Sequence, residues 1–143
     1  MIRGPHTSVF KTPLGWAGVV VSDQGICRVV LPKKEKKAIE RELRGSESGV
    51  RSSEGNKSSN SMVLKKAVTL LQKFFSGERV SIDLSLDLSY YTGFQRAVWK
   101  AAREIPYGET RSYAWIAARI GKPKAARAVG NALGANPVPV IIP

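Results

Sequence analysis

The chain has 143 residues and carries 23 lysines and arginines against 11 aspartates and glutamates, a formal net charge of +12. Its hydrophobic content of 43% is ordinary for a globular protein and argues against disorder over most of the chain. No apolar run approaches the ~20 residues that span a bilayer, and the first residues lack the apolar core of a signal peptide. We therefore expect an intracellular protein with no membrane partner. A domain this basic usually binds a polyanion, most often nucleic acid.

The N-terminal part is predicted to be a small α+β unit. Two β-rich runs, Trp16–Val21 and Ile26–Leu31, flank a polar, glycine-containing segment that is typical of a hairpin turn. Period 2 places Cys27, Val29 and Leu31 on one face of the second strand. Cys27 is then a small core residue, and as the single cysteine it excludes an internal disulfide.

Two helices, a loop and a further strand are predicted next. Charge and helix-forming composition indicate a helix over Lys33–Arg44, and apolar residues at helical spacing indicate another over Met62–Phe75. Residues 45–61 are rich in serine and glycine and predict a flexible loop. Alternating apolar and polar residues over Ser81–Leu88 predict a half-buried strand. The composition changes near residue 90, so we expect one domain over residues 1–89 and a second over 90–143.

Three helices are predicted in the second domain. Thr92 and Gln95 fit a capping box at the start of the first helix. Ser112 is expected to cap the second helix, with Trp115 on its apolar side. Pro123 suits the first turn of the third helix, because proline lacks only an amide that would be free there.

The second and third of these helices, joined by Gly121-Lys122, suggest a helix-turn-helix. Helical spacing turns one set of residues of the third helix inward, namely Ala126, Val129 and Leu133, and another set outward, namely Lys124, Arg127, Asn131 and Gly134. The remaining residues between 125 and 135 are small, so few side chains could reach base edges. We expect close approach to a narrow groove rather than sequence readout. A small-residue helix packed inside a bundle would have the same composition.

Four segments of this region resemble a known protein family. They are Thr92–Trp99, Ile105–Tyr113, Ala125–Ala132 and Asn136–Pro143. In this order and spacing they resemble the DNA-binding domain of the O6-alkylguanine-DNA alkyltransferases, also called methylated-DNA–protein-cysteine methyltransferases. The resemblance is strong over residues 92–143 and holds only in outline before them. It implies an α+β fold, in which a small N-terminal ribonuclease-H-like α/β domain precedes a helical, winged-helix-like domain with a helix-turn-helix.

The resemblance implies direct-reversal DNA repair. Such a protein binds double-stranded DNA containing O6-alkylguanine, flips the damaged base out of the helix, and transfers the alkyl group irreversibly to one of its own cysteines without a cofactor. One cysteine and one histidine, His6, cannot build the zinc site of some family members, so no metal is expected. We expect a monomer in the cytoplasm, associated with the nucleoid in a prokaryote, or in the nucleus of a eukaryote.

The resemblance also implies roles for individual residues. Arg127 resembles the arginine finger that enters the base stack through the minor groove and fills the place of the flipped nucleotide. Tyr113 resembles the tyrosine that crowds the 3′ phosphate and can donate a hydrogen bond to the guanine. Leu133 matches an apolar wall of the guanine pocket, and Asn136 matches the asparagine hinge between the recognition helix and the active-site strand. Positions that approach the DNA are matched by Gln95, Ala126, Ala128 and Gly130, and Lys124 and Asn131 join them from the outer face of the helix.

The nucleophile is expected just beyond Pro143. The family motif continues Ile-Pro-Cys-His-Arg, whereas this sequence stops at the proline, before the cysteine, its histidine and the last part of the domain. Cys27 cannot replace that cysteine, because it lies on a predicted strand of the other domain. Three explanations are open: the sequence stops where a modified cysteine or a break begins, or the gene is truncated, or a residue other than cysteine stands at that position. We favour the first two of these three, because a domain rarely ends inside a buried apolar strand such as Val138–Ile142. We expect the chain to Pro143 to be inactive.

Two other functions fit the same residues. An alkyltransferase-like protein keeps the arginine, the tyrosine and the pocket, lacks the cysteine, and marks lesions for excision repair. Such relatives usually lack the N-terminal domain. A plain helix-turn-helix regulator would bind one unmodified DNA sequence, for which the small-residue helix offers few base-reading side chains.

Overall fold

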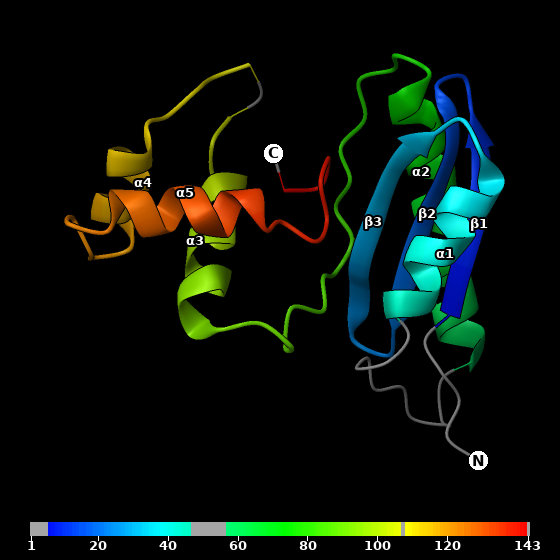
Figure 1. Cartoon of the computed structure of the whole chain (residues 1–143), viewed down its shortest axis with the longest axis horizontal. Helices are drawn as coiled ribbons and strands as arrows, with labels where there is room; N and C mark the ends of the chain where they lie inside the picture. The colour runs from blue at the N-terminus through cyan, green and yellow to red at the C-terminus, as the bar shows by residue number, and fades with distance from the viewer. Residues whose placement is uncertain (1–5, 47–56, 107, 143) are drawn as a thin grey trace. The chain divides into compact units, whose positions relative to one another are not determined.

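The computed structural model describes residues 6–46, 57–106 and 108–142. The chain divides into two compact units, Met1–Tyr90 and Tyr91–Pro143, and each is described by itself. Figure 1 shows their helices and strands in chain order. Within the described ranges, no helix combines the length and the apolar character that crossing a membrane requires.

The first unit is built on a three-stranded antiparallel sheet of order β1-β2-β3. Its strands are β1 (His6–Thr12), β2 (Gly15–Ser22) and β3 (Gly25–Lys33). The predicted hairpin is confirmed, because β2 pairs with β3 across a two-residue turn at Asp23 and Gln24. Strand β1 was not predicted from the sequence.

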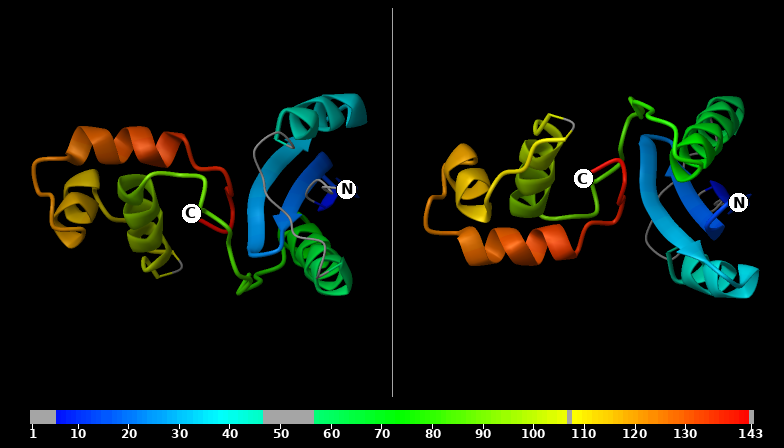
Figure 2. Two further views of the ribbon diagram at one scale, coloured as in Figure 1. Left: turned by 90° about the horizontal axis from the view of Figure 1, so that it is seen from below. Right: turned by 90° about the horizontal axis from the view of Figure 1, so that it is seen from above.

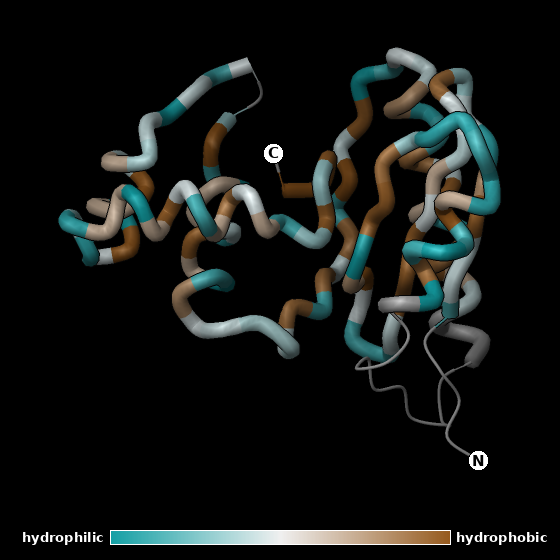
Figure 3. Tube along the Cα trace, viewed as in Figure 1, coloured by the Kyte–Doolittle hydropathy of each residue, from teal (hydrophilic) through white to brown (hydrophobic). Residues whose placement is uncertain are grey.

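Two helices cover this sheet, α1 (Lys36–Ser46) on one face and α2 (Lys57–Phe75) on the other (Figure 2). Strand β2 is accordingly buried from Ala17 through Ser22, without the alternation expected when one face meets water. Along the chain, β2 and β3 are mostly hydrophobic and α1 is mostly hydrophilic (Figure 3). Helix α1 approaches β2 closely at Gly18, where an added Cβ would lie 2.8 Å from the Ile39 side chain. The absence of a side chain at Gly18 thus allows α1 to pack closely on β2.

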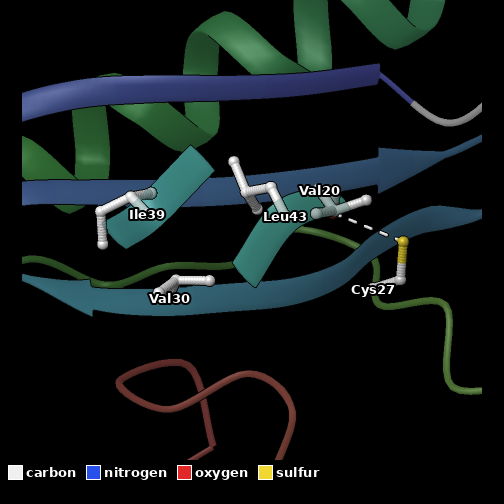
Figure 4. Packing of buried hydrophobic residues seen from close by; sticks show 5 residues of the cluster. All are labelled: Val20, Cys27, Val30, Ile39 and Leu43. Carbon is white, nitrogen blue, oxygen red and sulfur yellow. Dashed lines mark hydrogen bonds between the residues drawn. The ribbon is translucent and has the colours of Figure 1, made fainter. Parts of the chain in front are cut away.

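Cys27 belongs to the apolar cluster between α1 and the sheet. The cluster consists of Val20, Cys27, Val30, Ile39 and Leu43 (Figure 4). Cys27 is 7% exposed, which confirms it as a core residue, but Leu31 is 47% exposed and the predicted face is wrong. The register between β2 and β3 shifts twice and so interrupts the alternation of side chains, once between Val20 and Val21, opposite Cys27, and once between Trp16 and Gly18, opposite Leu31.

Residues 81–88 form no strand of the sheet. Leu84 and Leu86 are half-buried and Ser85 between them is exposed, as the alternation predicted, whereas Asp87 is half-buried. The pairing is nevertheless limited to one isolated bridge, between Ile26 and Leu86. Two hydrogen bonds hold it, from Ile26 N to the Ser85 carbonyl and from Asp87 N to the Ile26 carbonyl, each 2.8 Å long. The alternating burial of residues 81–88 therefore arises without a ladder of strand hydrogen bonds.

The predicted loop over residues 45–61 is too long. Helix α1 ends at Ser46 and α2 begins at Lys57, so residues 57–61 are helical. Extending a helix costs little once its apolar stripe is anchored, which lets α2 start in a polar stretch. Residues 47–56 lie outside the described residues.

The second unit packs three helices on one core: α3 (Gly93–Arg103), α4 (Tyr113–Arg119) and α5 (Ala126–Gly134). The capping box at α3 is confirmed, with Thr92 accepting from the Gln95 amide and the Gln95 side chain accepting from the Thr92 amide. Ser112 caps α4 as predicted, accepting from the Trp115 amide at 3.0 Å. The starts of α3 and α4 are thus set by local sequence.

The turn between α4 and α5 is a Schellman motif. Gly121 has φ +79, its amide donates to the Ala118 carbonyl, and the Lys122 amide donates to the Ala117 carbonyl at 2.8 Å. The prediction that Pro123 lies in the first turn of the third helix is wrong, because a separate turn over residues 122–125 comes first. The Ala125 amide closes that turn on the Lys122 carbonyl at 2.9 Å.

The two tryptophans of this unit differ in burial, and the one with a predicted position is more exposed than predicted. Trp115 was expected on the apolar side of α4 but is 36% exposed, with the Arg111 guanidinium 5.4 Å from its ring centre. Trp99, which the sequence analysis did not single out, is fully buried. Its indole N–H donates to the Ala132 carbonyl at 2.8 Å and so fastens α3 to α5. This hydrogen bond therefore anchors the buried side of α5 to α3.

Candidate nucleic-acid interface

The outer face of the helix-turn-helix is formed as predicted. Its four expected residues, Lys124, Arg127, Asn131 and Gly134, are all exposed. On the inner side Val129 is fully buried, whereas Ala126 and Leu133 are only half-buried. Ala132 takes the second deeply buried place on α5, which the predicted inner set missed.

The exposed side of α5 is narrow and positively charged. Ala128 is exposed and Gly130 half-buried beside Arg127, so no bulky neighbour keeps a partner away from the helix backbone. In the described part of this unit both acidic side chains are engaged, Glu104 with Arg119 and Glu109 with Arg111. Arg127 forms no ion pair among the described residues. A polyanion that approaches α5 therefore meets an uncompensated cation.

Tyr113 lies beside α5 although it belongs to α4. Its side chain is 53% exposed, yet its ring is so close to Gly130 that a Cβ there would lie 3.0 Å from Cε2. Gly130 follows Arg127 by three positions and therefore lies on the neighbouring turn of the same helix face. The structure thus brings the predicted tyrosine next to the helix that carries the predicted arginine.

Asn136 organises the segment after α5. Its Nδ2 donates to the Ile142 carbonyl at 2.7 Å, and its Oδ1 accepts from the Val138 amide at 2.9 Å. The Ile142 amide also donates to the Val138 carbonyl at 3.0 Å, and Val140 between them has φ +80. Val138 and Ile142 are buried, so these bonds fix a compact loop against the unit rather than an extended strand. The predicted apolar strand over residues 138–142 is thereby replaced by a loop.

The remaining predicted residues divide between this surface and the core. Leu133 is half-buried near the end of α5 and Ala126 at its start. Gln95 lies at the start of α3, where its side-chain carbonyl accepts from the Thr92 amide at 3.1 Å. That side chain is committed to the helix cap. Among the described residues, no group of three or more His, Cys, Asp or Glu side chains is placed to hold a metal ion.

Cys27 lies in the first unit and is chemically quiet. Burial raises the pKa of its thiol to about 12, helped by the negative charge of Asp87. The thiol itself donates to the Val20 carbonyl at 3.4 Å. Burial alone would raise the pKa of Asp87, but hydrogen bonds from Ser22 and Ser89 outweigh it, so that this pKa is lowered. At neutral pH the cysteine is therefore protonated and the aspartate charged.

We expect Cys27 to resist alkylation in the folded chain. Raising the thiol pKa from 9.0 to about 12 leaves on the order of 1,000-fold less thiolate at neutral pH, and the thiolate is the reactive form. Iodoacetamide labelling of the native chain, followed by mass spectrometry, should be slow, whereas the same chain in denaturant should react fully. Rapid labelling of the native chain would contradict the burial that we describe.

Two family models together match most of the chain. Residues 6–88 match the ribonuclease-like domain of 6-O-methylguanine DNA methyltransferase, and residues 93–143 match its DNA-binding domain. These matches confirm the predicted fold class, an N-terminal ribonuclease-like α/β domain followed by a helical DNA-binding domain.

Individual relatives agree with the family models. The methylated-DNA–protein-cysteine methyltransferase of Methanosarcina acetivorans is 37% identical over 138 residues, which are 96% of this chain and 80% of that protein. The Mycobacterium tuberculosis protein of the same name is 56% identical over 77 residues, 54% of this chain and 46% of its own length. The match thus spans about half the length of that relative.

Solved structures give the same result in three dimensions. A crystal structure of Mycobacterium tuberculosis O6-methylguanine methyltransferase has a TM-score of 0.69 and 35% identity, covering 97% of this chain and 75% of that one. A crystal structure of Mycobacterium tuberculosis OGT in complex with DNA has a TM-score of 0.69 and 34% identity, covering 96% and 74%.

Proposed function

Because the chain belongs to the 6-O-methylguanine DNA methyltransferase family, we propose that it acts in direct-reversal repair of O6-alkylguanine in duplex DNA. The observation that carries the proposal is the exposed face of α5, where Arg127 has small neighbours and no ion pair within the described part of the chain, and where the Tyr113 ring lies against Gly130. A slim helix with one planar cation suits insertion into a narrow groove. The same face has too few long polar side chains to read a base sequence.

In this proposal the two exposed side chains share the work of base flipping. Arg127 enters the base stack and occupies the space of the extruded nucleotide. Tyr113 crowds the adjacent phosphate and donates a hydrogen bond to the extruded guanine. Leu133 contributes an apolar wall to the guanine pocket. Lys124 and Asn131 add contacts to the DNA backbone from the same side, as lysine and asparagine side chains commonly do.

We further propose that the acceptor cysteine directly follows Pro143. The family motif supports this, because residues 136–143 resemble the part of it that precedes the cysteine, and Asn136 holds the Ile142 carbonyl at the end of that segment. The cysteine thiolate attacks the alkyl carbon, an S–C bond forms while the C–O6 bond breaks, and the electron pair stays on the departing guanine. The product thioether is stable, so each molecule acts once. Cys27 takes no part, since its thiol is protonated and buried.

Binding of the chain to DNA tests the first half of this proposal. We expect the chain to bind duplexes of unrelated sequence with similar affinity and to prefer those containing O6-methylguanine. The logarithm of the affinity should fall linearly with the logarithm of the salt concentration. Fluorescence anisotropy with matched damaged and undamaged duplexes measures all three. Tight binding to one undamaged sequence, with no effect of the lesion, would instead identify a helix-turn-helix regulator. Lesion binding by a complete protein that never becomes alkylated would identify an alkyltransferase-like protein.

A further inference from the structure

Two glycines of α5 have different surroundings. Gly130 lies in the middle of the helix, and a Cβ built there would lie 3.0 Å from Cε2 and 3.2 Å from Cδ2 of Tyr113. Gly134 lies at the end of the same helix, and a Cβ there would meet nothing within 4 Å. Glycine is unfavourable inside a helix, so its presence at position 130 calls for a local cause. The tyrosine ring is the group that a side chain at position 130 would meet.

We propose that Gly130 is a positioning residue for Tyr113. The missing side chain lets the ring rest on the backbone of α5, which restricts an aromatic side chain that is otherwise 53% exposed. An alanine at position 130 would come closer than nine in ten real Cβ contacts, so the ring would have to move. This inference rests on the proposed function, in which the position of the tyrosine beside the extruded base matters.

The contact couples the two helices of the helix-turn-helix. Arg127 and Gly130 are three residues apart, so the ring lies next to the turn from which the arginine projects. One helix therefore sets the location of both side chains to which the proposal gives a role in base flipping. A shift of the ring away from α5 would change the distance between them without altering either side chain.

A second explanation for the glycine makes a different prediction. If Gly130 is small only because DNA approaches the α5 backbone there, an added methyl group hinders the DNA whether or not the tyrosine is present. If Gly130 acts through Tyr113, the methyl group matters only while the ring is there. A double-mutant cycle separates the two explanations, because residues in contact give non-additive effects.

The test uses the full chain and four variants: Gly130→Ala, Tyr113→Ala, the double variant, and Gly134→Ala as the matched control. We expect Gly130→Ala to weaken binding to an O6-methylguanine duplex about 10-fold in the parent, and less than about 2-fold when Tyr113 is already alanine. Gly134→Ala should weaken binding less than Gly130→Ala does, because a methyl group at position 134 meets no side chain within 4 Å. Equal losses from Gly130→Ala in both backgrounds, or no loss in the parent, would overturn the inference.

Nuclear magnetic resonance of the free chain supplies a readout that does not depend on DNA. Nuclear Overhauser contacts should join the Tyr113 ring protons to the Gly130 Hα protons, and Gly130→Ala should shift the ring resonances while Gly134→Ala does not. Unshifted ring resonances in Gly130→Ala would also overturn the inference. If these contacts are present but the parent chain binds no damaged duplex, the proposed function fails and the packing of the ring stands.

Discussion

Replacing Arg127 with alanine should weaken binding to an O6-methylguanine duplex by about 1–3 kcal/mol, a loss of roughly 5- to 150-fold. The reason is specific to the place of the side chain. Arg127 is exposed on the narrow face of α5 and has no ion pair among the described residues, so its guanidinium is available to the DNA. In a complete protein, the variant should slow repair of duplex DNA far more than alkyl transfer from free O6-benzylguanine, because a free base needs no flipping.

Arg103→Ala is the matched control for this prediction. It also removes one exposed arginine from the second unit, but from the last turn of α3 rather than from α5. If an arginine variant does no more than remove one phosphate contact, the slope of log affinity against log salt should fall by about one. Equal losses by Arg127→Ala on duplex and on free base would refute the finger role, and equal effects of the two arginine variants would reduce Arg127 to a general charge.

Asn136→Ala should destabilise the second unit by about 1–3 kcal/mol, the cost of leaving buried backbone groups without partners. The variant removes the acceptor of the Val138 amide and the donor to the Ile142 carbonyl at once. Both partner residues are buried, at 0% and 1% exposure, so water cannot easily replace the lost bonds. Denaturant titration measures the change in unfolding free energy, and amide exchange at Val138 reports the loop itself.

Asn131→Ala provides the comparison, because Asn131 is exposed on α5 and should tolerate the change with little effect on stability. Asn136→Asp separates the two bonds, since a carboxylate still accepts from the Val138 amide but cannot donate to the Ile142 carbonyl. We expect it to keep slow exchange at Val138 while remaining less stable than the parent. An Asn136→Ala chain as stable as Asn131→Ala would show that the loop does not depend on this side chain.

The sequence predicted best those features that are decided locally. The caps at Thr92 and Ser112 depend on residues three positions away, and the outward face of α5 follows from helical period alone. The predictions for Leu31 and for the 81–88 segment were wrong because pairing register and strand partners are properties of the whole sheet. Alternation showed which side chains would be half-buried, but not whether a ladder would form.

In the candidate site, too, individual residues could be predicted from the sequence, whereas contacts between residues distant along the chain could not. The resemblance named Arg127, Tyr113 and Asn136, and the structure supplied what holds two of them. The contact between Tyr113 and Gly130 joins two helices, so no local pattern could have predicted it. The bond from Trp99 to the Ala132 carbonyl likewise spans 33 residues. A tryptophan at an inner position of α3 was the available signal, since a buried indole N–H needs an acceptor.

The intact mass of the protein produced from its complete gene, measured before and after incubation with O6-methylguanine duplex DNA, tests the central claim most directly. We predict a mass above the 15.6 kDa of this chain, and an increase by one methylene group after incubation. Peptide mapping should place the added group on a cysteine directly after Pro143 and leave Cys27 unmodified. A protein that binds the damaged duplex but never gains mass, or that gains it on another residue, would contradict the account.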